Sequence, residues 1–112
     1  EYGPVFTKKV KDIVENGFIK SVKLSSGIYQ SDTVINMIAV IEIKDGDKVL
    51  SWEGLVNKQV LEPNQWNSIN YQYTFMQSVT NKDTKVNIYL WNKDKQKFYI
   101  DDFRIVFITG SE

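Results

Sequence analysis

Residues 85–108, KVNIYLWNKDKQKFYIDDFRIVFI, form two runs of apolar and polar residues that are rich in valine, isoleucine, tyrosine, phenylalanine and tryptophan, with a charged segment between them. This composition predicts two long strands that form a hairpin, with the short charged turn Asn92-Lys93-Asp94-Lys95 between them. Successive residues of a strand point to opposite sides. The first strand therefore has an aliphatic face made of Val86, Ile88 and Leu90. Its other face carries an amide and two amphipathic rings, from Asn87, Tyr89 and Trp91.

The second strand of this stretch contains two adjacent carboxylates, Asp101 and Asp102, among apolar residues. Buried carboxylates are costly unless they have partners. The apolar positions also change parity here, because Phe98 and Ile100 alternate out of step with Phe103 and its successors. The change of parity predicts a β-bulge at Asp101-Asp102.

Four further strands are expected over residues 18–25, 34–44, 49–53 and 66–75, and Val5-Phe6 is a candidate for a short additional strand. A polar loop is expected over residues 26–33, a weak helical pattern covers residues 9–15, and Asp45-Gly46-Asp47-Lys48 predicts a tight hairpin turn. About seven short strands with polar connections predict an all-β, antiparallel two-sheet β-sandwich. The expected central strands are residues 35–43 and 86–90. The expected core consists of Met37, Ala39, Ile41, Ile69, Tyr71, Val86, Ile88, Leu90, Phe103 and Ile105.

The chain has 112 residues, the size of a single domain, and we expect one module over residues 1–112. Its abrupt start at Glu1-Tyr2-Gly3-Pro4 is consistent with a piece excised from a longer chain. Lysine plus arginine equals aspartate plus glutamate at 14 each, and Arg104 is the sole arginine, which disfavours nucleic acid as a partner. No apolar run is long enough to span a membrane.

There is no cysteine and no histidine. Disulfides, thiolate chemistry, and zinc sites built on thiolate or imidazole are therefore excluded. The sequence also lacks a glycine-rich phosphate loop and a nucleophile elbow. Asp101 and Asp102 are adjacent on a strand and point to opposite faces, so they do not form an acid–base pair acting on one bond. We therefore expect a protein that is not an enzyme.

Three segments together resemble a known group of domains: IAVIEIKDGDKVLSW, QWNSINYQYTF and NIYLWNKDKQKFYIDDFRIVF. In this order and spacing they are similar to the β-jelly-roll modules of the galactose-binding-domain-like superfamily, which includes many carbohydrate-binding modules. The pattern Tyr99-Ile100-Asp101-Asp102-Phe103 is the most specific part. The resemblance covers residues 38–107 and implies a jelly-roll sandwich. It also implies an accessory module that binds a polysaccharide or glycan, is attached to other domains, and lies outside the cell, in the periplasm or at the cell surface.

Aromatic faces attract the polarised C–H groups of a sugar ring, while amides and charged groups bind its hydroxyls. The candidate ligand-binding residues are therefore Asn87, Tyr89 and Trp91, joined by Asn36, Gln72 and Arg104 if their strands are neighbours. The alternative is that Tyr89 and Trp91 pack under a loop or between the sheets. Trp52 and Trp66, near strand ends, are expected in the core or at its rim, with a place on a ligand-binding face as the alternative. A structural or protein-interaction domain without a glycan site remains the second functional hypothesis.

In the resembled modules, the first aspartate of such a pair often ligates a structural calcium, which implies Asp101 as a possible metal ligand. The alternative follows from the residues themselves. In it, Asp101 caps backbone N–H groups at the bulge, and Asp102 pairs with Arg104 or a lysine.

Overall fold

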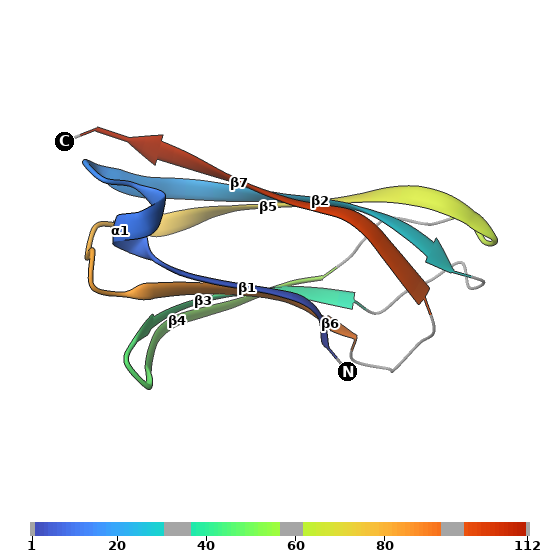
Figure 1. The fold of residues 1–112 in the computed structure, drawn as a ribbon, viewed down its shortest axis with the longest axis horizontal. Coiled ribbons are helices and arrows are strands. Elements are labelled where there is room, and N and C mark those ends of the chain that lie inside the picture. The colour runs from blue at the N-terminus through green and yellow to red at the C-terminus, as the bar shows by residue number, and fades with distance from the viewer. Residues whose placement is uncertain (1, 31–36, 57–61, 93–97, 112) are drawn as a thin grey trace.

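The chain folds into two antiparallel β-sheets that pack face to face (Figure 1). The computed structural model describes residues 2–30, 37–56, 62–92 and 98–111. The expected all-β, two-sheet sandwich is confirmed. The one helix in the described part of the chain is a single turn and is far too short to cross a membrane.

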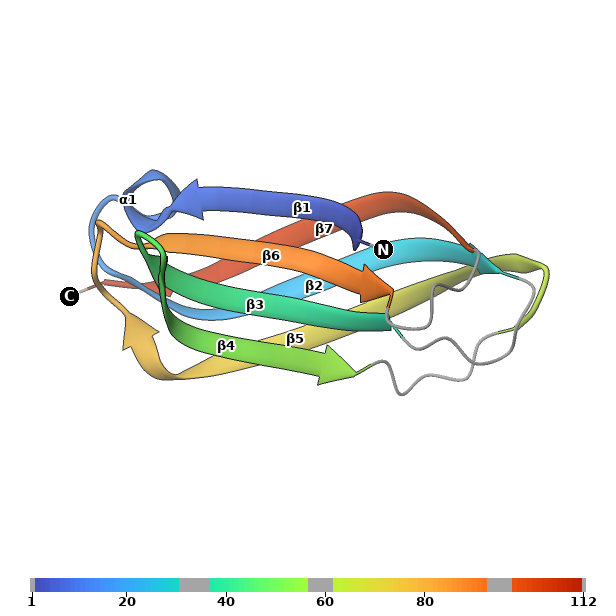
Figure 2. The ribbon, with the colours of Figure 1, turned by 90° about the horizontal axis from the view of Figure 1, so that it is seen from below.

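One sheet, called sheet A here, has the strand order β1-β6-β3-β4. Its strands are β1 (Tyr2–Lys9), β6 (Lys85–Asn92), β3 (Met37–Asp45) and β4 (Lys48–Val56). The other sheet, sheet B, has the order β5-β2-β7. Its strands are β5 (Gln65–Val79), β2 (Phe18–Gln30) and β7 (Phe98–Gly110). Helix α1 (Val10–Ile13) lies between β1 and β2 at one end of the sandwich, as both views show (Figure 2).

The core lies between the sheets and is built by the inward-facing half of each alternating strand. In β6 the burial pattern alternates strictly, with Val86, Ile88 and Leu90 buried. Of the expected core residues, Phe103 and Ile105 are partly buried and pack against the cluster, and the other eight are buried. The two sheets are also joined by a hydrogen bond, in which the Tyr71 hydroxyl of β5 donates to the Met37 carbonyl of β3 at 3.2 Å.

The expected central position of the two most apolar strands is confirmed for their described residues, because β3 and β6 are the inner strands of sheet A. The turn between β3 and β4 is also confirmed. Gly46 lies at its tip with φ +60°, a conformation that glycine adopts without a steric penalty.

Two sequence-based expectations about connectivity are wrong. Residues 85–108 are not a hairpin, because β6 pairs with β1 and β3 in sheet A whereas β7 pairs with β2 in sheet B. Residues 26–30 are not loop, because β2 continues to Gln30. As the middle strand of sheet B, β2 is hydrogen-bonded on both sides. That pairing holds a serine- and glycine-containing segment extended despite its weak β-propensity.

Candidate functional site

The outer face of sheet B carries an ordered arrangement of aromatic and polar side chains. Register places Tyr29 of β2 opposite Trp66 of β5 on one side and Tyr99 of β7 on the other. We call these three residues the aromatic row. The ring centroids of Tyr29 and Trp66 are 5.7 Å apart and those of Tyr29 and Tyr99 are 6.4 Å apart, both pairs tilted. The row is open to solvent, since Trp66 is 55% and Tyr99 60% exposed.

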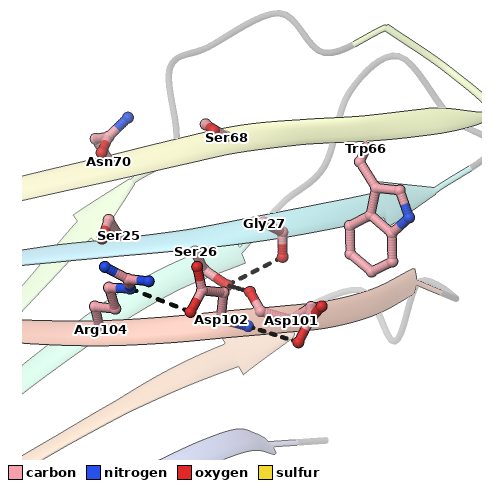
Figure 3. Close-up of a pocket in the computed structure, with 9 residues that line it drawn as sticks. All are labelled: Ser25, Ser26, Gly27, Trp66, Ser68, Asn70, Asp101, Asp102 and Arg104. Atoms are coloured by element: carbon pink, nitrogen blue, oxygen red, sulfur yellow. Dashed lines mark hydrogen bonds and ion pairs between the residues drawn. The ribbon is translucent and has the colours of Figure 1, made fainter.

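A polar cleft begins beside the aromatic row and follows the strands away from it (Figure 3). Its volume is about 360 Å³, at the lower end of the range of about 300–1,000 Å³ that is typical of small-molecule sites. Trp66 forms one end of the cleft, and hydroxyl, amide, carboxylate and guanidinium groups line the rest. The lining residues are Ser25, Ser26, Gly27, Trp66, Ser68, Asn70, Asp101, Asp102 and Arg104.

The middle of the cleft is deepened by Gly27 of β2, which has no side chain to fill it. A Cβ on Gly27 would lie 3.5 Å from Cε3 of Trp66 and 3.4 Å from the carbonyl oxygen of Asp101. The indole ring therefore lies against the backbone of β2 while staying half exposed. Flat rings on a bare backbone leave their other face available for a ligand.

The wall of the cleft is shaped by the predicted β-bulge, which the structure confirms. The register between β2 and β7 shifts between Ser25 and Gly27, and Asp102 has φ +56°, a left-handed conformation that Asp tolerates better than most residues. The side-chain oxygen Oδ1 of Asp101 accepts a hydrogen bond from the Asp102 backbone N–H at 2.9 Å. The Ser26 hydroxyl lies 3.0 Å from the Asp101 carbonyl oxygen and can donate to it.

The bulge also directs a charged pair toward the cleft. Arg104 Nε donates to Asp102 Oδ1 at 3.1 Å, and both side chains remain about two-thirds exposed, at 69% and 65%. Such an exposed pair adds little stability, on the order of 0–1 kcal/mol. Its main consequence is positional, because a guanidinium held at Nε keeps its terminal N–H groups available as hydrogen-bond donors. The structure contains the interactions expected for the alternative without calcium, in which Asp101 accepts a backbone N–H at the bulge and Asp102 pairs with Arg104.

The structure divides the predicted ligand residues between two opposite faces of the sandwich. Asn87, Tyr89 and Trp91 lie on the outer face of sheet A, since their neighbours in β6 are buried between the sheets. They are half-buried there, and Oδ1 of Asn87 is buried with no hydrogen-bond partner among the described groups. The rings are therefore neither in the intersheet core nor fully open.

Gln72 and Arg104 lie on the outer face of sheet B, away from that set. Arg104 lines the polar cleft, and Gln72 lies further along β5, beside Asn70 in a neighbouring hollow. Neither β5 nor β7 is a neighbour of β6, so these residues do not join Asn87, Tyr89 and Trp91. Asn36 lies outside the described residues.

The expectation that Trp52 and Trp66 belong to the core or its rim is wrong. Trp66 projects from the outer face of sheet B, and Trp52 projects from the outer face of sheet A, where it is 50% exposed. The prediction for Trp66 was wrong because alternation shows only that Trp66 and Ile69 point to opposite faces of their strand. It does not show which residues of other strands lie beside Trp66. Ser25, Gly27 and Tyr29 were missed because they fall in or beside the expected loop. Their one signal in the sequence was that Ile28 has the same parity as the apolar residues Val22 and Leu24.

The calcium-ligand role that the resemblance implies for Asp101 stays a prediction, because a calcium site also takes backbone carbonyl oxygens as ligands. Within residues 2–30, 37–56, 62–92 and 98–111, no three Asp, Glu, His or Cys side chains lie close enough to hold a metal ion together. Asp101 instead accepts a hydrogen bond at the bulge.

Comparison with known proteins adds no constraint on this site: the chain matches no protein-family model, and no curated protein or solved structure is significantly similar to it.

Proposed function

We propose that this domain is a non-catalytic carbohydrate-binding module that binds a polysaccharide or glycan in the polar cleft of sheet B. The observation that carries the proposal is the half-exposed Trp66 ring at the end of a cleft otherwise lined by hydroxyl, amide and charged groups. The proposal keeps the function expected from the sequence. It moves the main site from the outer face of sheet A to the outer face of sheet B.

The chemistry of the cleft suits a sugar in two respects. A pyranose has a face of polarised C–H groups, which the π-face of an indole attracts, and Trp66 presents such a face to solvent. Around the ring's edge, each hydroxyl of a sugar both donates and accepts hydrogen bonds. Asn70 and Ser68 offer both functions, while the Asp102–Arg104 pair offers an acceptor and donors side by side.

The open shape of the cleft favours a segment of a chain over a small enclosed ligand. Two cross-strand pairs of polar residues follow each other along the outer face, Ser25 with Asn70 and then Lys23 with Gln72. A glycan chain could therefore extend past the aromatic row along the strands. Binding would then depend on several weak subsites.

The non-catalytic part of the proposal rests on the local roles of the two carboxylates in the cleft. Asp101 holds the bulge through a backbone N–H, and Asp102 holds Arg104. The sequence offers no histidine or cysteine to act beside them. From the resemblance, we further propose that the domain is a jelly-roll module joined to a larger secreted or surface protein. Such a protein would encounter polysaccharides outside the cell.

A second candidate function is a protein-interaction domain that uses the outer face of sheet A. That face presents Val5, Trp52 and Val56, each at least half exposed. Apolar side chains gathered on one face are typical of sites that bind other proteins. The two hypotheses use opposite faces of the sandwich and can be tested separately.

The test is a screen of the purified domain on a glycan array. Affinity electrophoresis then follows in gels that contain the polysaccharides to which the domain binds on the array. The proposal expects retardation by at least one neutral or weakly charged polysaccharide. It expects the free oligosaccharide to perturb Trp66 fluorescence in a variant that retains Trp66 as its sole tryptophan. Absence of any retained glycan across plant, microbial and animal arrays would contradict the proposal and favour the interaction domain.

A further inference from the structure

The sandwich has two long sides, and they are closed to different extents. On the side where β1 and β7 meet, the rings of Phe6 and Phe107 contact each other across the sheets with centroids 5.7 Å apart. On the side where β4 and β5 meet, a cleft of about 510 Å³ opens between the sheets. Its apolar lining includes Ile43, Leu50 and Phe75.

Exposed apolar side chains lie at the mouth of this second side. Leu50 of β4 is about half exposed, and Met76 of β5 is 97% exposed. Both line the same cleft. Leaving large apolar side chains in water at an open edge of the core is unfavourable, and a partner that covers them gains that burial.

The edge strand on this side, β5, is unusual in its charge. It runs from Gln65 to Val79 without one charged side chain, whereas each of the other six described strands carries at least one. Its only strand partner in the described part of the chain is β2, and no other described strand pairs with its second edge. Edge strands of monomeric sandwiches are usually protected by lysines or other charges, and β5 lacks this protection.

The shape of β5 limits where a partner could pair. Its register with β2 is regular from Gln65 to Thr74 and breaks between Thr74 and Val79. An added strand would therefore pair over residues 65–74. Ten residues is ample for a stable ladder, since strands of about 5–6 residues are typical.

We propose that two copies of this chain associate through antiparallel pairing of β5 with β5, which joins the two B sheets into one six-stranded sheet. The absence of charged side chains in β5 favours a second copy of β5 as the partner. A two-fold axis makes the interface self-complementary, so a charged residue near the axis would face its own copy. β5 has no such residue. The other edges do: β7 carries Asp101 and Asp102, β1 carries Lys8 and Lys9, and β4 carries Lys48.

The geometry of this dimer has a consequence for ligand binding. The two-fold axis of an antiparallel strand pair is perpendicular to the sheet, so the outer faces of both B sheets would look the same way. The two polar clefts would then lie on one continuous surface. If the clefts bind glycan as proposed above, one polysaccharide could engage both, with a gain from effective concentration. Dimer formation itself does not rest on the glycan proposal.

The experiment measures mass by sedimentation velocity without glycan, across a concentration series. Gln72 of β5 and Val106 of β7 provide matched variants, because both lie opposite Lys23 on the outer face of sheet B. Gln72→Lys and Val106→Lys therefore add the same charge beside the same lysine. Only Gln72→Lys adds it at the proposed interface.

The wild-type protein should reach about twice the 13.0 kDa mass of the monomer. Val106→Lys should behave like it, and Gln72→Lys should raise the dimer dissociation constant about tenfold or more, with recovery at high salt. Amide exchange over residues 65–74 should slow as concentration rises. Circular dichroism checks that both variants fold. A wild-type mass of 13.0 kDa at millimolar concentration, equal weakening by both variants, or protection on another strand would each overturn the proposal.

Discussion

Trp66 of β5 rests against the backbone of Gly27 in the neighbouring strand β2, with Cε3 of the ring 3.5 Å from where a Cβ on Gly27 would lie. This relationship holds the ring in a defined position on the surface of sheet B without burying it. A ring positioned by backbone needs little reorganisation when it meets a ligand, which favours affinity.

Trp66→Ala should weaken glycan binding about tenfold or more, because stacking on an aromatic side chain is worth about 1–3 kcal/mol in comparable nucleic-acid sites. The thermal midpoint should change little, because the ring is 55% exposed. Loss of a fully buried tryptophan would instead cost about 3–5 kcal/mol. Affinity electrophoresis and a thermal melt on the same sample measure both effects.

The matched control is Trp52→Ala, which removes a tryptophan of similar exposure, 50%, from the opposite face of the sandwich. It should leave glycan affinity unchanged. If Trp52→Ala or Trp91→Ala abolishes binding while Trp66→Ala does not, the glycan binds the outer face of sheet A. That is the face on which the sequence pattern placed Asn87, Tyr89 and Trp91.

Substitutions at Gly27 should have graded effects on affinity. The Cβ of Gly27→Ala would make ordinary contacts, at 3.4 Å to the Asp101 carbonyl oxygen and 3.5 Å to Trp66, so this variant should bind nearly as well as wild type. The additional methyl groups of Gly27→Val would push against the indole ring and lower the affinity. The measurement is isothermal titration calorimetry with the best oligosaccharide. Equal affinity of the Val and Ala variants would show that the ring position is irrelevant to binding.

Arg104→Gln should separate binding from stability. Its ion pair with Asp102 is about two-thirds exposed, so the free energy of unfolding should fall by less than about 1 kcal/mol. Glycan affinity should fall severalfold, because the guanidinium donates into the cleft. Lys48→Gln, which removes a cation from β4 in the opposite sheet, serves as the control. If both variants lose affinity equally, the effect is one of net charge and not of Arg104 contacts.

Tyr71 should make the fold sensitive to alkaline pH. Burial raises the pKa of Tyr71 from 10.0 to about 12. The unfolded chain therefore loses this proton at a lower pH than the folded protein. The contribution of Tyr71 to stability is complete below pH 10.0 and is lost as pH rises from there through about 12.

Urea unfolding of wild type and Tyr71→Phe across this pH range measures the effect. Tyr71→Phe should cost about 1 kcal/mol at neutral pH, because the Met37 carbonyl loses its donor, and its stability should then fall less steeply with pH. Parallel curves for Tyr71→Phe and wild type would show that other groups control the alkaline transition.

Much of the sandwich could be predicted from sequence because its signal is local. Alternation with a period of two specifies which side chains of one strand share a face, as for Val86, Ile88 and Leu90 in β6. The change of parity at Asp101-Asp102 is equally local, and it correctly predicted the bulge. Two inner faces of this kind can bury their apolar side chains only against each other, which leads to two packed sheets.

Which strands become neighbours is decided by long-range pairing, and no local pattern encodes it. The charged segment after β6 is compatible with a hairpin, yet β7 is in the other sheet because β2 offers it a full-length partner. The same pairing keeps residues 26–30 extended and brings Gly27 beneath Trp66 and beside Asp101. The sequence alone determined which residues of one strand share a face. Tertiary structure decided which of them meet, because a surface site belongs to strands that are adjacent in space and distant along the chain.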